Sequence, residues 1–155
     1  MKQNSTAKEQ SLNPQPAVNI ETQPTSVSAD QLDERLLGAL NAAAEKKALD
    51  VVVLDLREIA SFTDFFVITT GANERQVQAI SDEVYETLKK SGSTAARVEG
   101  YKTAEWVLLD YGDFVFHVFE QKARLFYDLE RLWRESKRVD LPAEIVGTSS
   151  LRSDS

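Results

Sequence analysis

Apolar residues recur at every third or fourth position in residues 32–43 and again in 77–88. This spacing predicts two amphipathic helices. Between them lie two apolar runs, LDVVVLDL at 49–56 and FFVITT at 65–70, which are rich in β-branched and aromatic residues. Runs of this length and composition are typical of strands buried on both faces. The first half of the chain therefore predicts the order helix, strand, strand, helix.

Capping residues support both helices. Asp30 precedes the first helix as a candidate N-cap. Asn73 and Gln76 have the spacing of a capping box at the start of the second helix, with Asn in place of Ser or Thr. Gly92 follows that helix as a candidate C-cap.

The second half predicts a short strand near 96–99, a hairpin over 105–120 and a third helix over 121–135. The whole order is then α-β-β-α-β-β-β-α, which predicts an α/β fold with a mixed sheet of about five strands and helices packed on it. On the third helix, Tyr127 lies opposite the apolar arc and is a candidate interface anchor or an ordinary exposed tyrosine. The arc expected to face the core consists of Leu125, Phe126, Leu129, Leu132 and Trp133.

The hairpin has two different faces. With Tyr111-Gly112 as a two-residue turn, Trp106 is expected to lie opposite His117. One face is wholly apolar and is expected to pack on helices; it holds Val107, Leu109, Phe114, Phe116 and Val118. The other face is mixed; it holds Trp106, Leu108, Asp110, Asp113, Val115, His117 and Phe119. If the mixed face is exposed, it is an aromatic patch edged with acid, which is typical of an interaction surface.

The two ends of the chain differ from the body between residues 30 and 135. Residues 1–29 are rich in Gln, Asn, Ser, Thr and Pro and contain few large apolar residues, and residues 136–155 look similar after SKRVDLP. We expect both ends to be disordered tails. The expected organisation is thus one folded domain at 30–135 with a tail on each side.

Composition narrows the class of protein. The chain has no cysteine and one histidine, which excludes disulfides, thiolate metal sites and a multi-histidine zinc site. No apolar run approaches the ~20 residues of a membrane span, and the N-terminus lacks the apolar core of a signal peptide. We expect a protein of the cytoplasm that does not bind a membrane.

Charge is concentrated in the body. Both tails have no net charge, and residues 30–135 hold 13 cations and 20 anions, a net charge of −7. An acidic body repels phosphate backbones, so direct binding to nucleic acid is disfavoured, whereas a basic protein partner would be attracted. Ordinary solubility charge explains the same balance.

Catalytic patterns are sparse. His117 is in a strand, where a structural or surface role is commoner than that of a general base. Asp110 and Asp113 are able to hold Mg²⁺ if they converge, but aspartates also flank turns for backbone reasons. TTGANERQ places a glycine before a helix, where phosphate can bind, but no nucleotide-binding glycine motif is present. We therefore expect no catalytic residues, no metal and no cofactor.

Four segments together resemble one family, in order and in spacing. They are ALDVVVLDL, SFTDFFVITTG, VEGYKTAEWVLLDYGDFVFHVF and ARLFYDLERLW, and they span about residues 31–134. On these segments the chain resembles the ribosomal silencing factor family (RsfS, also called Iojap). The resemblance implies a fold related to nucleotidyltransferases but without their catalytic motif.

The resemblance also implies a function. Family members bind the large ribosomal subunit through large-subunit ribosomal protein fourteen, and they block joining of the small subunit by steric exclusion when nutrients are scarce. The family's contact surface has positions that match Trp106, Tyr111 and Tyr127 here. Face parity on the hairpin adds Leu108, Asp110 and His117 to this candidate partner-binding set.

Other readings stay open. The same surface would serve a factor for maturation of the large subunit. A degenerate nucleotidyltransferase would use Asp64, Asp110 or Asp113 with Mg²⁺. An exposed aromatic face would also allow the free protein to form a homodimer.

Overall fold

A computed structural model describes residues 26–147 of the 155-residue chain. These residues form a seven-stranded sheet in the order β1-β7-β2-β3-β6-β5-β4. The pairs β1–β7 and β3–β6 are parallel, and the other neighbours are antiparallel. The strands are β1 (Ser26–Ser28), β2 (Leu49–Asp55), β3 (Phe65–Gly71), β4 (Arg97–Glu99), β5 (Trp106–Asp110), β6 (Phe114–Glu120) and β7 (Lys137–Asp140).

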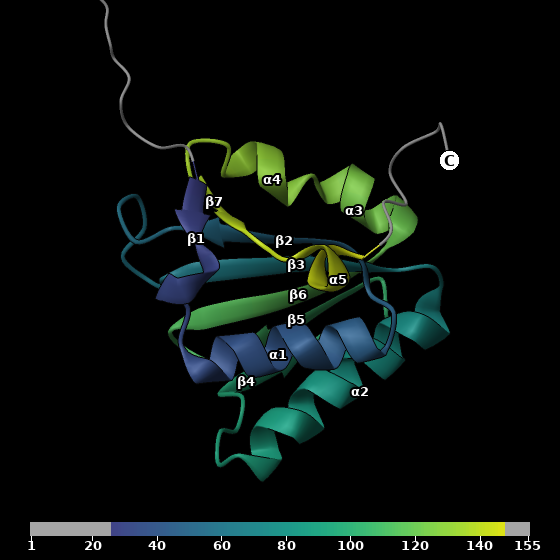
Figure 1. Cartoon of the computed structure of the whole chain (residues 1–155). Helices are drawn as coiled ribbons and strands as arrows, with labels where there is room; N and C mark the ends of the chain where they lie inside the picture. The colour runs from purple at the N-terminus through teal and green to yellow at the C-terminus, as the bar shows by residue number, and fades with distance from the viewer. Residues whose placement is uncertain (1–25, 148–155) are drawn as a thin grey trace, which may run out of the picture.

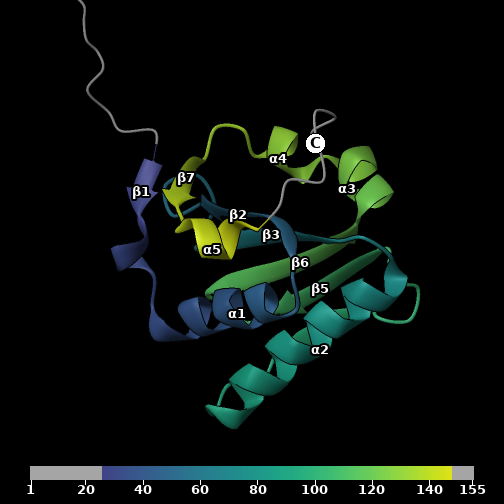
Figure 2. The same ribbon diagram turned by 45° about the vertical axis from the view of Figure 1, so that its right-hand side comes forward.

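Helices cover both faces of the sheet (Figures 1 and 2). In Figure 1, α1 and α2 lie below the sheet and α3 and α4 lie above it, while the short α5 sits beside β2. The mixed α/β class expected from the sequence is confirmed. The helices are the 3-10 turn η3 (Ala29–Gln31), α1 (Glu34–Glu45), α2 (Glu74–Lys90), α3 (Gln121–Tyr127), α4 (Leu129–Leu132) and α5 (Ala143–Val146).

Two strands lie outside the predicted body and raise the strand number from about five to seven. β7 pairs with β2, and β1 pairs with β7. The expectation of a disordered tail at 136–155 is therefore wrong up to Gly147, and the expectation for 1–29 is wrong from Ser26 onward. Both strands are short and polar and bury one valine each, Val27 and Val139, so they lack a strand pattern. Residues 1–25 and 148–155 lie outside the described residues.

The larger core lies between the sheet and the α1–α2 layer. α1 begins after Asp33, whose carboxylate accepts a hydrogen bond from the backbone N–H of Leu36 at 2.9 Å, so the N-cap is Asp33 and not Asp30. α2 begins after Asn73, as predicted, and the Asn73 side chain accepts from the N–H of Gln76. The helix residues buried here include Leu36, Leu40, Val77, Ile80, Val84 and Leu88.

The smaller core lies on the opposite face, under α3 and α4. The predicted single helix over 121–135 is wrong, because Asp128 adopts a left-handed conformation with φ 50° and ends α3 there. Three residues expected to be buried point outward: Leu125, Phe126 and Leu132 are 63%, 79% and 70% exposed. Leu129 alone of the predicted arc is fully buried, and Trp133 is partly buried against the core.

Candidate docking surface

The β5–β6 hairpin has the predicted face parity but not the predicted register. Trp106 lies opposite Phe119, and Leu108 lies opposite His117, so the strands are offset by two residues from the expected pairing. The reason is that the turn lies one residue later than predicted, at Gly112 and Asp113, where the N–H of Tyr111 donates to the carbonyl of Phe114 at 2.9 Å. An offset of two keeps every side chain on its face, because strand side chains alternate.

The mixed face of the hairpin is the one that α3 and α4 cover. Trp106 and Leu108 are partly buried beside the smaller core, and Phe119 is fully buried in it. Asp110, also half-buried, accepts from the N–H of Gly112 at 2.9 Å and lies 3.5 Å from the guanidinium of Arg97. The face is therefore closed around Phe119 and open along β5.

His117 is buried, not exposed. It is 2% exposed, and its ring lies 4.5 Å from that of Phe66. The indole N–H of Trp106 donates to Nδ1 of His117 at 3.0 Å. Burial lowers the pKa of His117 to about 3, so the ring is neutral near pH 7 and carries its proton on Nε2. His117 is thus an acceptor that orients the Trp106 indole.

Tyr127 extends the cluster of aromatic rings around Trp106 toward solvent. Its ring centroid lies 4.7 Å from that of Trp106, and the Trp106 ring stacks on Phe119 at 5.0 Å. On the outer side, Phe126 packs edge-to-face on Tyr127 at 5.0 Å. Tyr127 is 46% exposed, so one continuous set of rings runs from the smaller core to the surface.

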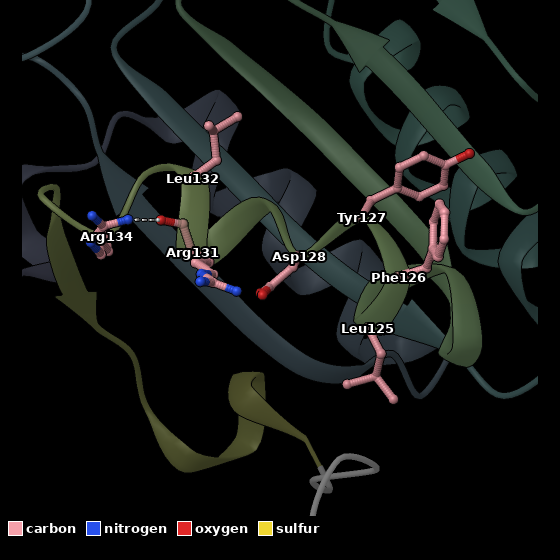
Figure 3. A pocket seen from close by; sticks show the side chains of 7 residues that line it. All are labelled: Leu125, Phe126, Tyr127, Asp128, Arg131, Leu132 and Arg134. Atoms are coloured by element: carbon pink, nitrogen blue, oxygen red, sulfur yellow. Dashed lines mark hydrogen bonds between the residues drawn. The ribbon is translucent and has the colours of Figure 1, made fainter.

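A groove lies where α3 ends and α4 begins (Figure 3). Its volume is about 510 Å³, and Figure 3 shows side chains from both helices around it. Together with Trp106 and Leu108, the exposed apolar residues of this groove form what we call the docking surface. The groove is lined by Leu125, Phe126, Tyr127, Asp128, Arg131, Leu132 and Arg134.

Arg124 holds the two short helices on the sheet. Its guanidinium is 2% exposed and donates to the carbonyl of Asp50 at 2.6 Å and to the hydroxyl of Thr70 at 2.8 Å. It also makes two hydrogen bonds to the carboxylate of Glu130, at 3.2 and 2.9 Å. A buried guanidinium needs such partners to offset its lost hydration. The position of the docking surface thus depends on β2 and β3 as well as on α3 and α4.

The structure separates Tyr111 from the other candidate residues. Tyr111 is 7% exposed and stacks on Phe114 at 5.0 Å, in the core on the α1–α2 side of the sheet. Its hydroxyl has no hydrogen-bond partner among the described residues, and burial raises the pKa of Tyr111 to about 12. Tyr111 is therefore a core residue and not part of the docking surface.

The carboxylates considered for Mg²⁺ do not form one site. Asp110 pairs with Arg97, whereas Asp113 lies in the turn and pairs with Arg35 of α1 at 2.6 Å. Asp64 and Asp113 both line a cavity of about 190 Å³ that is also lined by Arg57. Within residues 26–147 no cluster of three or more His, Cys, Asp or Glu side chains is placed to hold a metal ion.

Sequence reasoning missed three residues of the docking surface, namely Leu125, Phe126 and Leu132. Their helical periodicity indicated burial, and the only local signal against it was Asp128. Aspartate tolerates the left-handed conformation better than most residues, but an aspartate in a polar helix face is too common to predict a break.

None of the helices in the described part of the chain has the length and apolar composition of a membrane span.

Known proteins resemble this chain over most of its length. The family model described as "Ribosomal silencing factor during starvation" matches residues 29–154. A protein named ribosomal silencing factor RsfS from Halalkalibacterium halodurans is 44% identical over 112 residues, which are 72% of this chain and 96% of that protein.

Two further matches are a solved structure and a protein whose name refers to assembly of the large ribosomal subunit. A crystal structure of a Chromobacterium violaceum protein has a TM-score of 0.64 and 33% identity, and the match covers 76% of this chain and 94% of that one. A mouse protein named "Mitochondrial assembly of ribosomal large subunit protein 1" is 29% identical over 66% of this chain and 46% of its own length.

Proposed function

The chain belongs to the ribosomal silencing factor family, and we propose that it binds the large ribosomal subunit through large-subunit ribosomal protein fourteen. In this proposal the bound protein sterically blocks joining of the small subunit and so represses translation in the cytoplasm when nutrients are limiting. The observation that carries the proposal is the docking surface, because it gathers the exposed apolar side chains of Leu125, Phe126 and Leu132 in one groove with Tyr127, whose ring contacts Trp106.

The composition of the docking surface fits a protein partner. Trp and Tyr are enriched among the residues that carry most of the binding energy at protein interfaces. Here the rings of Trp106 and Tyr127 contact each other at a tilt of 47°, beside the smaller core. Leu108 lies beside Trp106 on the same strand face. Because His117 accepts a hydrogen bond from the Trp106 indole, that ring is oriented before any partner arrives.

A subunit-joining assay tests the proposal. Purified small and large subunits are mixed with this protein and separated on a sucrose gradient, and wild-type protein is expected to reduce the joined fraction. Tyr127→Glu should weaken large-subunit binding at least tenfold, because it places a charge at the centre of the apolar contact. The matched control is Tyr101→Glu. Tyr101 is also partly exposed, at 38%, but it lies away from the docking surface, beside α2, where its hydroxyl donates a hydrogen bond to Asp82.

Circular dichroism melts of both variants show whether the fold survives. Tyr127→Glu is preferable to a Trp106 variant because Trp106 is partly buried and its loss would also unfold the smaller core. If folded Tyr127→Glu protein blocks joining as well as wild type does, the docking surface is not the binding site.

The mouse relative supports a second candidate function, a role in assembly of the large subunit. The same surface would serve either function, so binding assays do not separate them. Precursor ribosomal RNA in a strain that lacks this protein does: its accumulation indicates maturation, and normal RNA with faster subunit joining indicates silencing.

We also propose that the protein is not an enzyme. His117 is buried and accepts a hydrogen bond from the Trp106 indole, and Asp110 and Asp113 each form an ion pair with a different arginine. Mg²⁺-dependent nucleotide binding that is lost in Asp113→Asn would contradict this and favour the degenerate nucleotidyltransferase.

In the absence of ribosomes, the docking surface would let two copies of the chain form a homodimer, and Tyr127→Glu should then sediment as a monomer.

A further inference from the structure

The charge of this protein is divided unevenly over its structure. From 121 to 138 the chain carries six cations and three anions, whereas the rest of the described chain carries nine cations and nineteen anions. The positive segment contains α3 and α4, and with them the most exposed apolar side chains of the docking surface. Repulsion of phosphate is therefore expected for the rest of the described chain but not for residues 121–138.

Two arginines in this segment are exposed and have no ion-pair partner among the described residues, although the guanidinium of Arg134 donates one hydrogen bond to the carbonyl of Arg131 at 3.2 Å (Figure 3). Arg131 and Arg134 are exposed and line the groove at the α3–α4 junction (Figure 3). In the part of the chain that the structure describes, neither guanidinium has a carboxylate at ion-pair distance. Three of the other four cations of the segment are already paired, since Arg124 and Arg138 share Glu130, and Lys137 pairs with Glu58.

An exposed aromatic ring lies in the same groove. Phe126 is 79% exposed and contacts Tyr127 edge-to-face, so most of its ring is available to a ligand. Exposed guanidiniums that share a groove with an exposed ring are a combination that proteins use to bind RNA, because arginine binds phosphate and the ring stacks on a base. An acidic protein segment would also pair with arginine, but it would not use the open ring in this way.

We infer that the groove at the α3–α4 junction binds the phosphate backbone of large-subunit RNA, with Arg131 and Arg134 on phosphates and Phe126 available to a base. This inference rests on the proposed function, because it assigns a second component of the same subunit to the same surface. Trp106 and Leu108 on β5, together with Tyr127 at the edge of the groove, then contact protein. The acidic remainder of the described chain is repelled by RNA and so opposes binding in any other orientation.

Salt dependence of binding tests the inference. The affinity of the protein for purified large subunits is measured at salt concentrations from about 50 to about 200 mM. Over this range, binding that depends on phosphate contacts weakens strongly. Arg131→Gln/Arg134→Gln should lower the slope of log affinity against log salt by about 0.7 for each arginine, because fewer counterions are released. At 0.1 M salt this corresponds to an affinity loss on the order of ten- to thirty-fold.

Three controls make the result specific. Arg75→Gln removes an equally exposed arginine from α2 and should leave the slope unchanged. Arg131→Lys/Arg134→Lys keeps both charges and should keep most of the slope. Binding to purified large-subunit ribosomal protein fourteen should be the same for wild type and for the glutamine variant.

The outcomes are distinguishable. Equal losses on the subunit and on the isolated ribosomal protein would mean that the arginines bind an acidic protein surface, which overturns the inference. An unchanged slope on the subunit overturns it as well, while the proposed function stands. Failure of wild-type protein to bind the subunit at all would instead overturn the proposed function. As a direct check, hydroxyl-radical footprints on the large-subunit RNA should be lost in the glutamine variant alone.

Discussion

At the scale of single residues, burial decides what His117 does. A histidine that is accessible near neutral pH is a candidate base, but this one is enclosed by Phe66, Phe119 and Trp106. Its low pKa follows from the loss of hydration of the charged ring and not from a neighbouring charge. The neutral ring accepts the Trp106 N–H, so the residue contributes to binding only by orienting another side chain.

The buried histidine predicts a pH dependence of stability. Because the folded-state pKa of about 3 lies below the usual value of 6.5, the unfolded chain binds a proton between these two pH values and the folded chain does not. The free energy of unfolding should therefore fall as pH decreases below 6.5, by about 2 kcal/mol between pH 7 and pH 5.

Urea unfolding of wild type and His117→Gln at both pH values measures this effect. Glutamine retains an acceptor for Trp106 but does not titrate, so the carboxylates common to both proteins cancel in the comparison. Wild type should lose about 2 kcal/mol more than the variant on acidification. Equal losses would mean that His117 is accessible to protons in the folded state.

At the scale of elements, the break between α3 and α4 creates the docking surface. A continuous helix would have turned Leu125, Phe126 and Leu132 inward, as their periodicity indicates. The left-handed residue Asp128 ends α3, and the bonds of Arg124 to β2, β3 and Glu130 hold both helices in place. Contacts between distant segments have therefore overridden a local helical pattern.

Arg124→Met should destabilise the protein by about 3 kcal/mol, because it removes four hydrogen bonds and leaves the partners of a buried ion pair unsatisfied. Urea unfolding gives this value. The control is Arg138→Met, since Arg138 is 56% exposed and lies 3.7 Å from the same Glu130, so its loss should cost less than about 1 kcal/mol. Similar costs for the two variants would show that burial of Arg124 is unimportant.

At the scale of the whole molecule, the ends of the described chain complete the sheet. β7 covers the edge of β2, and β1 adds to β7, although the two strands are more than one hundred residues apart in the chain. Together with α5 they bury Val27, Val139 and Ile145. The folded domain is consequently longer at both ends than the body that the sequence indicates.

A chain that stops at residue 135 should be largely unfolded. It lacks Val139 and Ile145 and leaves β1 without a partner, and burial of three such apolar side chains contributes about 6 kcal/mol, a large part of the stability of an ordinary domain. A chain that stops at 147 retains every described residue and should melt close to the full-length protein. Circular dichroism melts compare the two, and a cooperative, native-like transition of the shorter chain would contradict the assignment of β7 and α5 to the fold.

Local patterns in the sequence were sufficient for α1, α2, β2, β3 and the alternation of the β5–β6 hairpin. These elements pack against a core along their whole length, so burial imposes a clear period on their residues. For the same reason Trp106, Leu108 and Asp110 were correctly placed on one face, whereas the contact between the Trp106 and Tyr127 rings was found only in the structure. Residue order and motif spacing were also enough to indicate the family.

Only the tertiary structure decided the rest. The hairpin register depends on turn geometry, the burial of His117 and Tyr111 depends on which layer covers each face, and the outward direction of Phe126 depends on one left-handed residue. β1 and β7 are stabilised by pairing with distant strands and not by their own composition. In each case the deciding energy comes from contacts between residues far apart in the chain, which local periodicity does not record.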